Sequence, residues 1–389
     1  MLRRYRLKDL NFILMAVLFV IGVIGIMLVG SADESLQNRQ LLGFIAGYVI
    51  MIFVAFVDYS WILNFYWLIY VLNLVLLGSV LIMGLTTNGA TRWISIGGDN
   101  GISFQPTELS KILLILFFAM FLMKHENDLN TFGTIIKAVV LMAVPIGMVA
   151  SQPDLKNAIT FTILFCIIMY VAGLSYKIIG KVVIVAVPLF LVAFLLITQT
   201  DLPILDDYQK TRIMTFLNSE DDEYSESAAQ QENSVTAIGS GRLTGKGLNN
   251  SSVISSNKGN FVAETQNDFI FAVAGEELGF IGCTVIVILL LLIVFLCIRT
   301  GSRAKDLAGQ IICSGVASVV AIQSFINICV ATGLLPNTGT PLPFISYGLT
   351  SLISLFIGMG FVLNVGLQRR KFDKEPGLRR IDYSKLMNR

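Results

Sequence analysis

Histidine is nearly absent from this sequence. The 389 residues include one histidine, His125, which lies in a short charged stretch between two apolar runs. This scarcity excludes histidine-based metal sites and Ser-His triads, because both need an imidazole placed beside further ligands or a nucleophile. Proton transfer by this protein must therefore use a carboxylate, a lysine or a tyrosine.

Charged residues are scarce as well. They make up 14% of the chain, against 55% hydrophobic residues, whereas soluble domains are nearer a quarter charged. The composition therefore excludes a soluble globular protein. The apolar run at 12–30 is long enough to cross a hydrocarbon core of roughly 30 Å. No small-residue cleavage site follows this run, so we interpret it as the first transmembrane helix and not as a signal peptide.

The cysteines offer no metal-binding pattern. All of them lie inside apolar runs, and no two have the spacing of metal ligands. Buried cysteines behave as small apolar residues, so we interpret these as core residues and predict no metal centre. The five are Cys166, Cys283, Cys297, Cys313 and Cys329.

Ten apolar runs predict an all-α polytopic membrane protein, a single integral membrane domain over residues 1–389. The runs lie at about 11–30, 40–57, 62–85, 107–123, 133–150, 157–174, 182–199, 268–298, 308–333 and 344–367. Lysine and arginine gather on one side of these spans, which places both termini and the basic tail 368–389 in the cytoplasm. The longest loop, 200–267, then lies outside the cytoplasm between the seventh and eighth helices. A loop of this length is usually functional.

Two charged residues lie near the outward end of the fourth run. Pro106 suits the first turn of a helix, and Glu108 and Lys111 follow within one further turn. Their i, i+3 spacing puts them on one helical face. Two interpretations stay open: an ion pair that neutralises itself inside the membrane, or a lysine that faces a cavity and binds an anionic group.

Three outward segments carry charges that have ordinary explanations. Arg92 precedes a tryptophan, which is a common interface anchor, and Asp154 fits a short turn. The glycine-rich stretch 237–247 resembles a phosphate-binding loop, but glycine follows Lys246 where serine or threonine is required. Its amides and Lys246 can still contact the phosphate of a lipid headgroup.

The stretch 262–282 contains the most unusual acids. A polar approach runs into an apolar helix, and Asp268, Glu276 and Glu277 fall within its first turns. Asp268 and Glu276 are eight residues apart and so share one face. Acids in a membrane span are costly unless they are paired, solvated or used. Asp268 either marks the start of the helix, where an acid suits the dipole, or works as an acid in a cavity; we interpret Glu276 and Glu277 as structural.

The connection between the last two runs holds three prolines and several glycines within 327–348. Irregular backbone at membrane depth is tolerated where protein buries it or it lines a watery cavity. We therefore predict a re-entrant segment that forms one wall of a cavity. The chain has no internal repeat and no matching pair of broken helices, both of which are common in transporters.

Motifs in order along nearly the whole chain resemble the SEDS family, the shape, elongation, division and sporulation proteins of bacteria. The motifs are Asn88-Gly-Ala-Thr-Arg-Trp-Ile, Phe104-Gln-Pro-Thr-Glu-Leu-Ser-Lys, Gln152-Pro-Asp-Leu, Tyr208-Gln-Lys-Thr-Arg-Ile, Ala237-Ile-Gly-Ser-Gly, Asp268-Phe-Ile-Phe-Ala-Val-Ala-Gly-Glu-Glu and Pro341-Leu-Pro-Phe-Ile-Ser-Tyr-Gly. The fourth and fifth motifs resemble the rod-shape branch, RodA, more than the division branch, FtsW. The chain departs from the family pattern at Lys156, Arg242 and Leu349 and in the stretch just before Asp268.

The resemblance implies ten spans and a peptidoglycan glycosyltransferase that polymerises lipid II, a lipid-linked disaccharide-peptide, during cell elongation and shape maintenance. Its chemistry inverts an α-linked donor to a β-1,4 product, with polyprenyl diphosphate as the leaving group. The family's catalytic aspartate falls on Asp268, its Glu-Leu-x-Lys pair on Glu108 and Lys111, and its Pro-Asp-Leu aspartate on Asp154. Asp268 is then the general base.

The departing pyrophosphate needs cations, for which Lys111, Arg92 and Arg212 are the candidates. A divalent cation is compatible with this chemistry, but no ligand pattern fixes one, so no cofactor is predicted. The resemblance also implies a class B penicillin-binding protein as the transpeptidase partner. Membrane lipids are expected partners and nucleic acid is not. The alternatives are a flippase for the lipid-linked precursor and a non-catalytic scaffold of a cell-wall complex in the cytoplasmic membrane.

Overall fold

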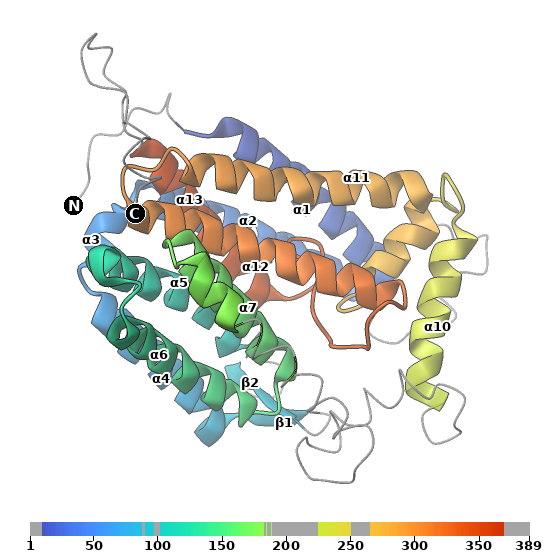
Figure 1. Ribbon diagram of the computed structural model, residues 1–389. Helices are drawn as coiled ribbons and strands as arrows, with labels where there is room; N and C mark the ends of the chain where they lie inside the picture. Colours follow the sequence, from blue (N-terminus) through green and yellow to red (C-terminus); the bar gives the residue numbers. More distant parts are fainter. Residues whose placement is uncertain are drawn as a thin grey trace.

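The computed structural model describes residues 10–87, 90–96, 102–182, 225–249 and 265–368, besides positions 184 and 188. This part of the chain is mostly helical (Figure 1). The elements in order are α1 (Phe12–Ala32), α2 (Glu34–Phe56), α3 (Tyr59–Leu63), α4 (Tyr66–Met83), β1 (Leu85–Thr87), β2 (Ala90–Ile96), β3 (Ile102–Phe104), α5 (Pro106–Lys124), the short 3-10 helix η2 (Glu126–Asp128), α6 (Phe132–Ala150), α7 (Leu155–Val171), α10 (Ser225–Ser240), α11 (Ile270–Gly301), α12 (Leu307–Ala331) and α13 (Leu349–Leu367).

Seven of the described helices are long and apolar enough to cross a membrane, so the chain is an integral membrane protein. They are α1, α2, α5, α6, α11, α12 and α13, and α4 and α7 are shorter apolar helices. These nine helices coincide with nine of the ten predicted runs. The run at 182–199 lies outside the described residues apart from three positions, so the count of ten and the position of the long loop stay predictions.

The last helix, α13, forms the centre of the bundle. It packs along α2 and also against α5, α11 and α12, and most of its residues are buried. Such burial suits a helix that is apolar all round. Small residues allow the close approach to α2: a Cβ on Gly360 would lie only 2.7 Å from Val54 Cβ.

A three-stranded antiparallel sheet lies in the connection between α4 and α5. Its strand order is β1-β2-β3, and β2 pairs with β3 through Ile94–Phe104, Ser95–Ser103 and Ile96–Ile102. The fold is therefore mostly helical but not all-α as predicted, because the short strands interrupt a segment that hydropathy marked only as a loop. The sheet leads directly into the start of α5, where the main-chain N–H of Gln105 donates to Thr350 Oγ1 at the start of α13 (3.4 Å).

A further helix, α10, lies within the segment that was predicted only as a loop. It packs against α11 and α12 (Figure 1). Ser234 Oγ donates to the main-chain oxygen of Ala331 (2.8 Å), and Gln231 Nε2 donates to that of Leu335 (2.6 Å). These bonds satisfy carbonyls at and just beyond the end of α12, which have no partner within the helix.

Helix α11 is broken at Gly279, whose φ of 68° and ψ of −167° are not helical. The segment 242–247, which follows α10, bridges this break. The N–H groups of Lys246 and Gly247 donate to the oxygens of Glu276 and Glu277 (2.9 and 3.0 Å). In return, the N–H groups of Phe280 and Ile281 donate to the oxygens of Arg242 and Leu243 (2.8 and 3.1 Å). We call residues 242–247 the strap, because its main chain supplies bonds that the broken helix lacks.

Candidate functional site

The predicted catalytic acid, Asp268, lies just before α11 and not within its first turn. It belongs to the turn Thr265–Phe269, and helix α11 starts at Ile270. Asp268 is half-buried. Within the described part of the chain its carboxylate has no hydrogen-bond partner, whereas its main-chain oxygen accepts a bond from Asn327 Nδ2 (2.8 Å). As far as the described ranges extend, the carboxylate is therefore held in place through the backbone alone.

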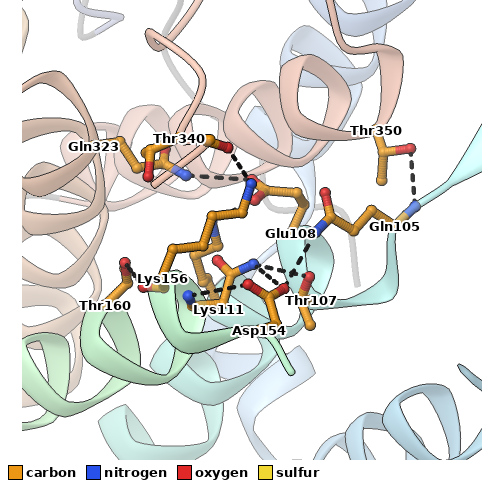
Figure 2. Close-up of polar contacts among 12 residues, drawn as sticks. Gln105, Thr107, Glu108, Lys111, Asp154, Lys156, Thr160, Gln323, Thr340 and Thr350 are labelled. Carbon is orange, nitrogen blue, oxygen red and sulfur yellow. Dashed lines mark hydrogen bonds and ion pairs between the residues drawn. The ribbon is translucent and has the colours of Figure 1, made fainter. Parts of the chain in front are cut away.

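Glu108 and Lys111 form an ion pair inside the bundle. Lys111 Nζ lies 2.6 Å from Glu108 Oε1, and the two side chains are only 1% and 4% exposed. The second oxygen, Glu108 Oε2, accepts a bond from Gln323 Nε2 of α12 (3.4 Å) (Figure 2). The local spacing thus predicted a real contact, and the pairing accounts for both charges. A role for Lys111 in binding an anion stays a prediction.

Asp154 joins the start of α7 to the start of α5 (Figure 2). It is fully buried and caps α7, since Oδ1 accepts from the N–H of Asn157 (3.4 Å). Its Oδ2 accepts from Asn157 Nδ2 (2.7 Å) and from Gln105 Nε2 (3.5 Å). These bonds are typical of an N-cap, and they give Asp154 a supporting position beside the Glu108–Lys111 pair.

Two further cations near this network donate to main-chain oxygens. Lys156, one of the departures from the family motif, donates from Nζ to the oxygen of Gly339 in the connection between α12 and α13. Its side chain points toward Glu108 (Figure 2). Arg92 of β2 donates from Nη2 to the oxygen of Pro153. Arg92 therefore ties the sheet to the start of α7, and Lys156 ties the connection between α12 and α13 to the same place.

The acids deeper in α11 are engaged by other elements. Glu276 is 1% exposed, and its Oε1 lies 2.6 Å from Lys246 Nζ of the strap. Glu277 accepts a hydrogen bond from the hydroxyl of Ser31 at the end of α1. These contacts engage both acids within the protein, and their structural role stays a prediction. The phosphate-binding role of Lys246 stays a prediction. Arg212, another candidate ligand of the diphosphate, lies outside the described residues.

Sequence reasoning missed Gln323 and Asn327 of α12. Gln323 reaches Glu108, while Asn327 reaches the backbone of Asp268. Residues four apart share one helical face and are separated by about 6 Å along the axis. The Glu108–Lys111 ion pair and the segment Thr265–Phe269 therefore contact the same face of α12, at positions roughly one helical turn apart. The signal that could have found them is a pair of amides, four residues apart, in a mostly apolar helix.

No cluster of three or more histidine, cysteine or acidic side chains that could hold a metal occurs in the described ranges. The free cysteines are buried in the spans, except for Cys166, which is exposed. The arrangement therefore offers a half-buried carboxylate, a buried ion pair and two cations on main-chain oxygens as its chemical groups.

Comparison with known proteins gives consistent matches over nearly the whole chain. The family model described as cell cycle protein, FtsW/RodA/SpoVE, matches residues 7–371. The chain is 33% identical over 371 residues to the probable peptidoglycan glycosyltransferase FtsW of Geobacter sulfurreducens, covering 92% of this chain and 94% of the relative. It is 30% identical over 372 residues to the peptidoglycan glycosyltransferase MrdB of Escherichia coli K12, covering 95% and 96%.

A solved structure also matches the fold. It is described as structural coordination of polymerization and crosslinking by a peptidoglycan synthase complex, and one of its chains superposes with a TM-score of 0.75 at 26% identity. The match covers 93% of this chain and 99% of that one. The similarity therefore extends over the whole bundle and is not confined to the motifs.

Proposed function

The chain belongs to the FtsW/RodA/SpoVE family of cell cycle proteins, and from this premise we propose that it is a peptidoglycan glycosyltransferase that polymerises lipid II into glycan strands. Two relatives that match it over more than nine-tenths of their length are named as a probable peptidoglycan glycosyltransferase and a peptidoglycan glycosyltransferase. The single observation that carries the proposal is the state of Asp268, a half-buried carboxylate with no hydrogen-bond partner in the described part of the chain.

The proposed reaction is one in-line displacement at the sugar. The 4-hydroxyl oxygen of the acceptor attacks the reducing-end carbon of the donor, and Asp268 takes the hydroxyl proton. The bond from that carbon to the diphosphate oxygen breaks, and polyprenyl diphosphate leaves with the electron pair. A positioned general base typically contributes about 10²–10⁴-fold to the rate. A carboxylate that already accepted two strong hydrogen bonds would be a poor base. The carboxylate oxygens of Asp268 accept none from the described residues, so they can take a proton.

The cations proposed for the leaving diphosphate are Lys111, Arg92, Arg212 and Lys246. Charge-assisted bonds to phosphate oxygens are strong, and three of these residues already hold oxygen atoms of this chain: Lys111 a carboxylate, Lys246 a carboxylate and Arg92 a carbonyl. A diphosphate must compete with those partners.

We further propose that the protein acts in the cytoplasmic membrane with both termini inside, and that its role is cell elongation. The basic residues of the tail and the motifs resembling the rod-shape branch support this assignment. The proposed partner is a class B penicillin-binding protein, because the structural relative belongs to a complex that couples polymerization to crosslinking. Elongation and division are separated by whether loss of the gene changes cell width or blocks septation.

Purified protein given labelled lipid II tests the proposal. We expect glycan chains from the native protein and none from Asp268→Asn, which keeps the shape of the side chain but cannot accept the proton. The control variant is Asn364→Ala. Asn364 lies near the end of α13 and has no proposed role in catalysis. Native protein that moves lipid II between leaflets without forming chains would indicate a flippase. Protein that does neither would indicate a scaffold, and polymerisation by Asp268→Asn would exclude Asp268 as the base.

A further inference from the structure

Three consecutive main-chain oxygens in the turn before α11 are held by donors from elsewhere in the chain. Gln266 O accepts from the N–H of Tyr347 (2.9 Å), and Asn267 O accepts from Ser346 Oγ (2.6 Å). Asp268 O accepts from Asn327 Nδ2 (2.8 Å). Every carbonyl from 266 to 268 is therefore fixed by α12 or by the connection between α12 and α13.

The side chains that donate these bonds are themselves fixed. Asn327 Nδ2 donates its second hydrogen to the oxygen of Thr340 (2.7 Å), so one amide joins two segments. Ser346 Oγ accepts from the N–H of Leu342 (2.8 Å), which orients its own hydroxyl hydrogen toward Asn267. Asn327 is 1% exposed and Ser346 is 5% exposed. The donors thus belong to a buried framework of hydrogen bonds within the protein.

The amide oxygen of Asn327, Oδ1, indicates which of its bonds stabilise the protein. Its Oδ1 is buried and has no hydrogen-bond partner in the part of the chain that the structure describes. A buried acceptor without a donor carries a desolvation penalty, which an apolar residue of the same shape would avoid. An asparagine at this position is therefore a poor choice for packing alone. Its stabilising contribution comes from the two bonds that Nδ2 donates.

We propose that Asn327 and Ser346 are positioning residues for Asp268, acting through its backbone. This inference rests on the proposed function and extends it to residues that do not touch the reacting atoms. Since no side chain in the described ranges orients the Asp268 carboxylate, its direction depends on the main-chain conformation at 267–268. The carbonyl bonds set that conformation and so direct the Cα–Cβ bond toward the sugar hydroxyl. A misplacement of about 1 Å can lower a rate by about 10²-fold.

The kinetic test compares Asn327→Ala with Asn364→Ala. Asn364 is also a buried asparagine whose Nδ2 donates to a main-chain oxygen, that of Ala55 (2.7 Å), but it lies near the end of α13. We expect Asn327→Ala to lower kcat for lipid II polymerisation by about 10–100-fold, with KM changed less than about threefold. Asn364→Ala should leave both constants within about threefold in the folded fraction. Equal losses of kcat in the two variants would overturn the proposal.

Ser346 gives the same test with a milder change. Ser346→Ala removes the hydroxyl and should lower kcat by about tenfold, and Ser346→Thr, which retains a hydroxyl, should recover most of the rate. If Asn327→Ala does not fold, this pair decides the question. A rate for Ser346→Ala equal to that of the native protein would contradict the proposed role.

A measurement that needs no activity separates this inference from the proposed function. In a Cys166→Ser background, Asp268→Cys places a thiol at the position of the carboxylate, and its rate of reaction with a water-soluble maleimide reports how that side chain is presented. Adding Asn327→Ala should change the labelling rate several-fold, whereas adding Asn364→Ala should not. An unchanged labelling rate overturns the positioning role even in an active enzyme. Native protein that makes no glycan overturns the proposed function alone.

Discussion

Replacing Gly279 by alanine should detach the strap from the break in α11. Gly279 has φ 68° and ψ −167°, a conformation that is essentially restricted to glycine. A Cβ at this position would overlap the N atom of Gly245 and lie 2.7 Å from the main-chain oxygen of Leu243. Both atoms belong to the backbone of the strap, so no side-chain rotation can relieve the overlap. Either the strap moves away or the two halves of α11 rotate.

The size of the effect follows from two contributions. A side chain in this region of φ and ψ costs about 1–3 kcal/mol. Displacing the strap also breaks the four main-chain bonds that bridge the helix, each with a net value of about 0.5–1.5 kcal/mol, or about 2–6 kcal/mol together. The expected loss of about 3–9 kcal/mol approaches the whole stability of many proteins, which is about 5–15 kcal/mol. We therefore expect low yield and a greatly lowered Tm.

Thermal unfolding in detergent, with protease cleavage near the strap as a second readout, measures this effect. Gly239→Ala is the matched control, because Gly239 lies in α10 and a Cβ there meets no atom within 4 Å. Alanine is favoured over glycine in a helix by about 1 kcal/mol, so the control should be neutral or slightly stabilising. A native Tm and native protease resistance for Gly279→Ala would refute the reasoning about the strap.

Two further predictions concern charged groups. Lys246→Met removes a cation that lies 2.6 Å from buried Glu276 and should destabilise the protein by about 3–5 kcal/mol, whereas the double variant with Glu276→Leu should recover most of the loss. The Tm values of the native protein and the two variants test this. Desolvation raises the pKa of Asp58, but bonds from Gln368 and from the N–H of Ser60, with the charge of Lys305, outweigh it and hold the pKa below the usual value. A lowered pKa stabilises the fold above the ordinary value of about 4 and stops doing so as pH falls through the folded value. Asp58→Asn should therefore flatten the decline of Tm between about pH 5 and pH 3, and an unchanged decline would show that Asp58 does not contribute.

The sequence was sufficient for features that depend on composition and short spacing. An apolar run of about twenty residues predicts a span whatever its neighbours are, and nine of the ten predicted runs are helices in the described ranges. The Glu108–Lys111 contact was predictable for the same reason, since residues three apart on a helix always face the same side. Neither inference requires knowledge of the tertiary fold.

The features that were missed depend on partners far away in the sequence. The sequence of α10 is polar, and its place is set by carbonyls at the end of α12, about 100 residues later. The partner of Lys246 is 30 residues away and becomes a neighbour only because the strap bridges Gly279. Asn327 and Ser346 bind main-chain oxygens, which leave no trace in the identity of the residues they belong to. Sequence patterns describe side chains, so contacts to the backbone are the last to be predicted.

The short helix between Asp268 and Gly279 links these observations. Every residue from Phe269 to Glu277 is buried, so this half of α11 cannot shift without disturbing the core, which is packed like a crystal. One end is fixed by the donors to the carbonyls at 266–268, and the other end is fixed by the strap. A helix fixed at both ends fixes the direction of the acid that precedes it. Changes in the strap at positions other than Lys246 should therefore weaken catalysis in proportion to how far they loosen this helix, without any contact between the changed residue and the substrate.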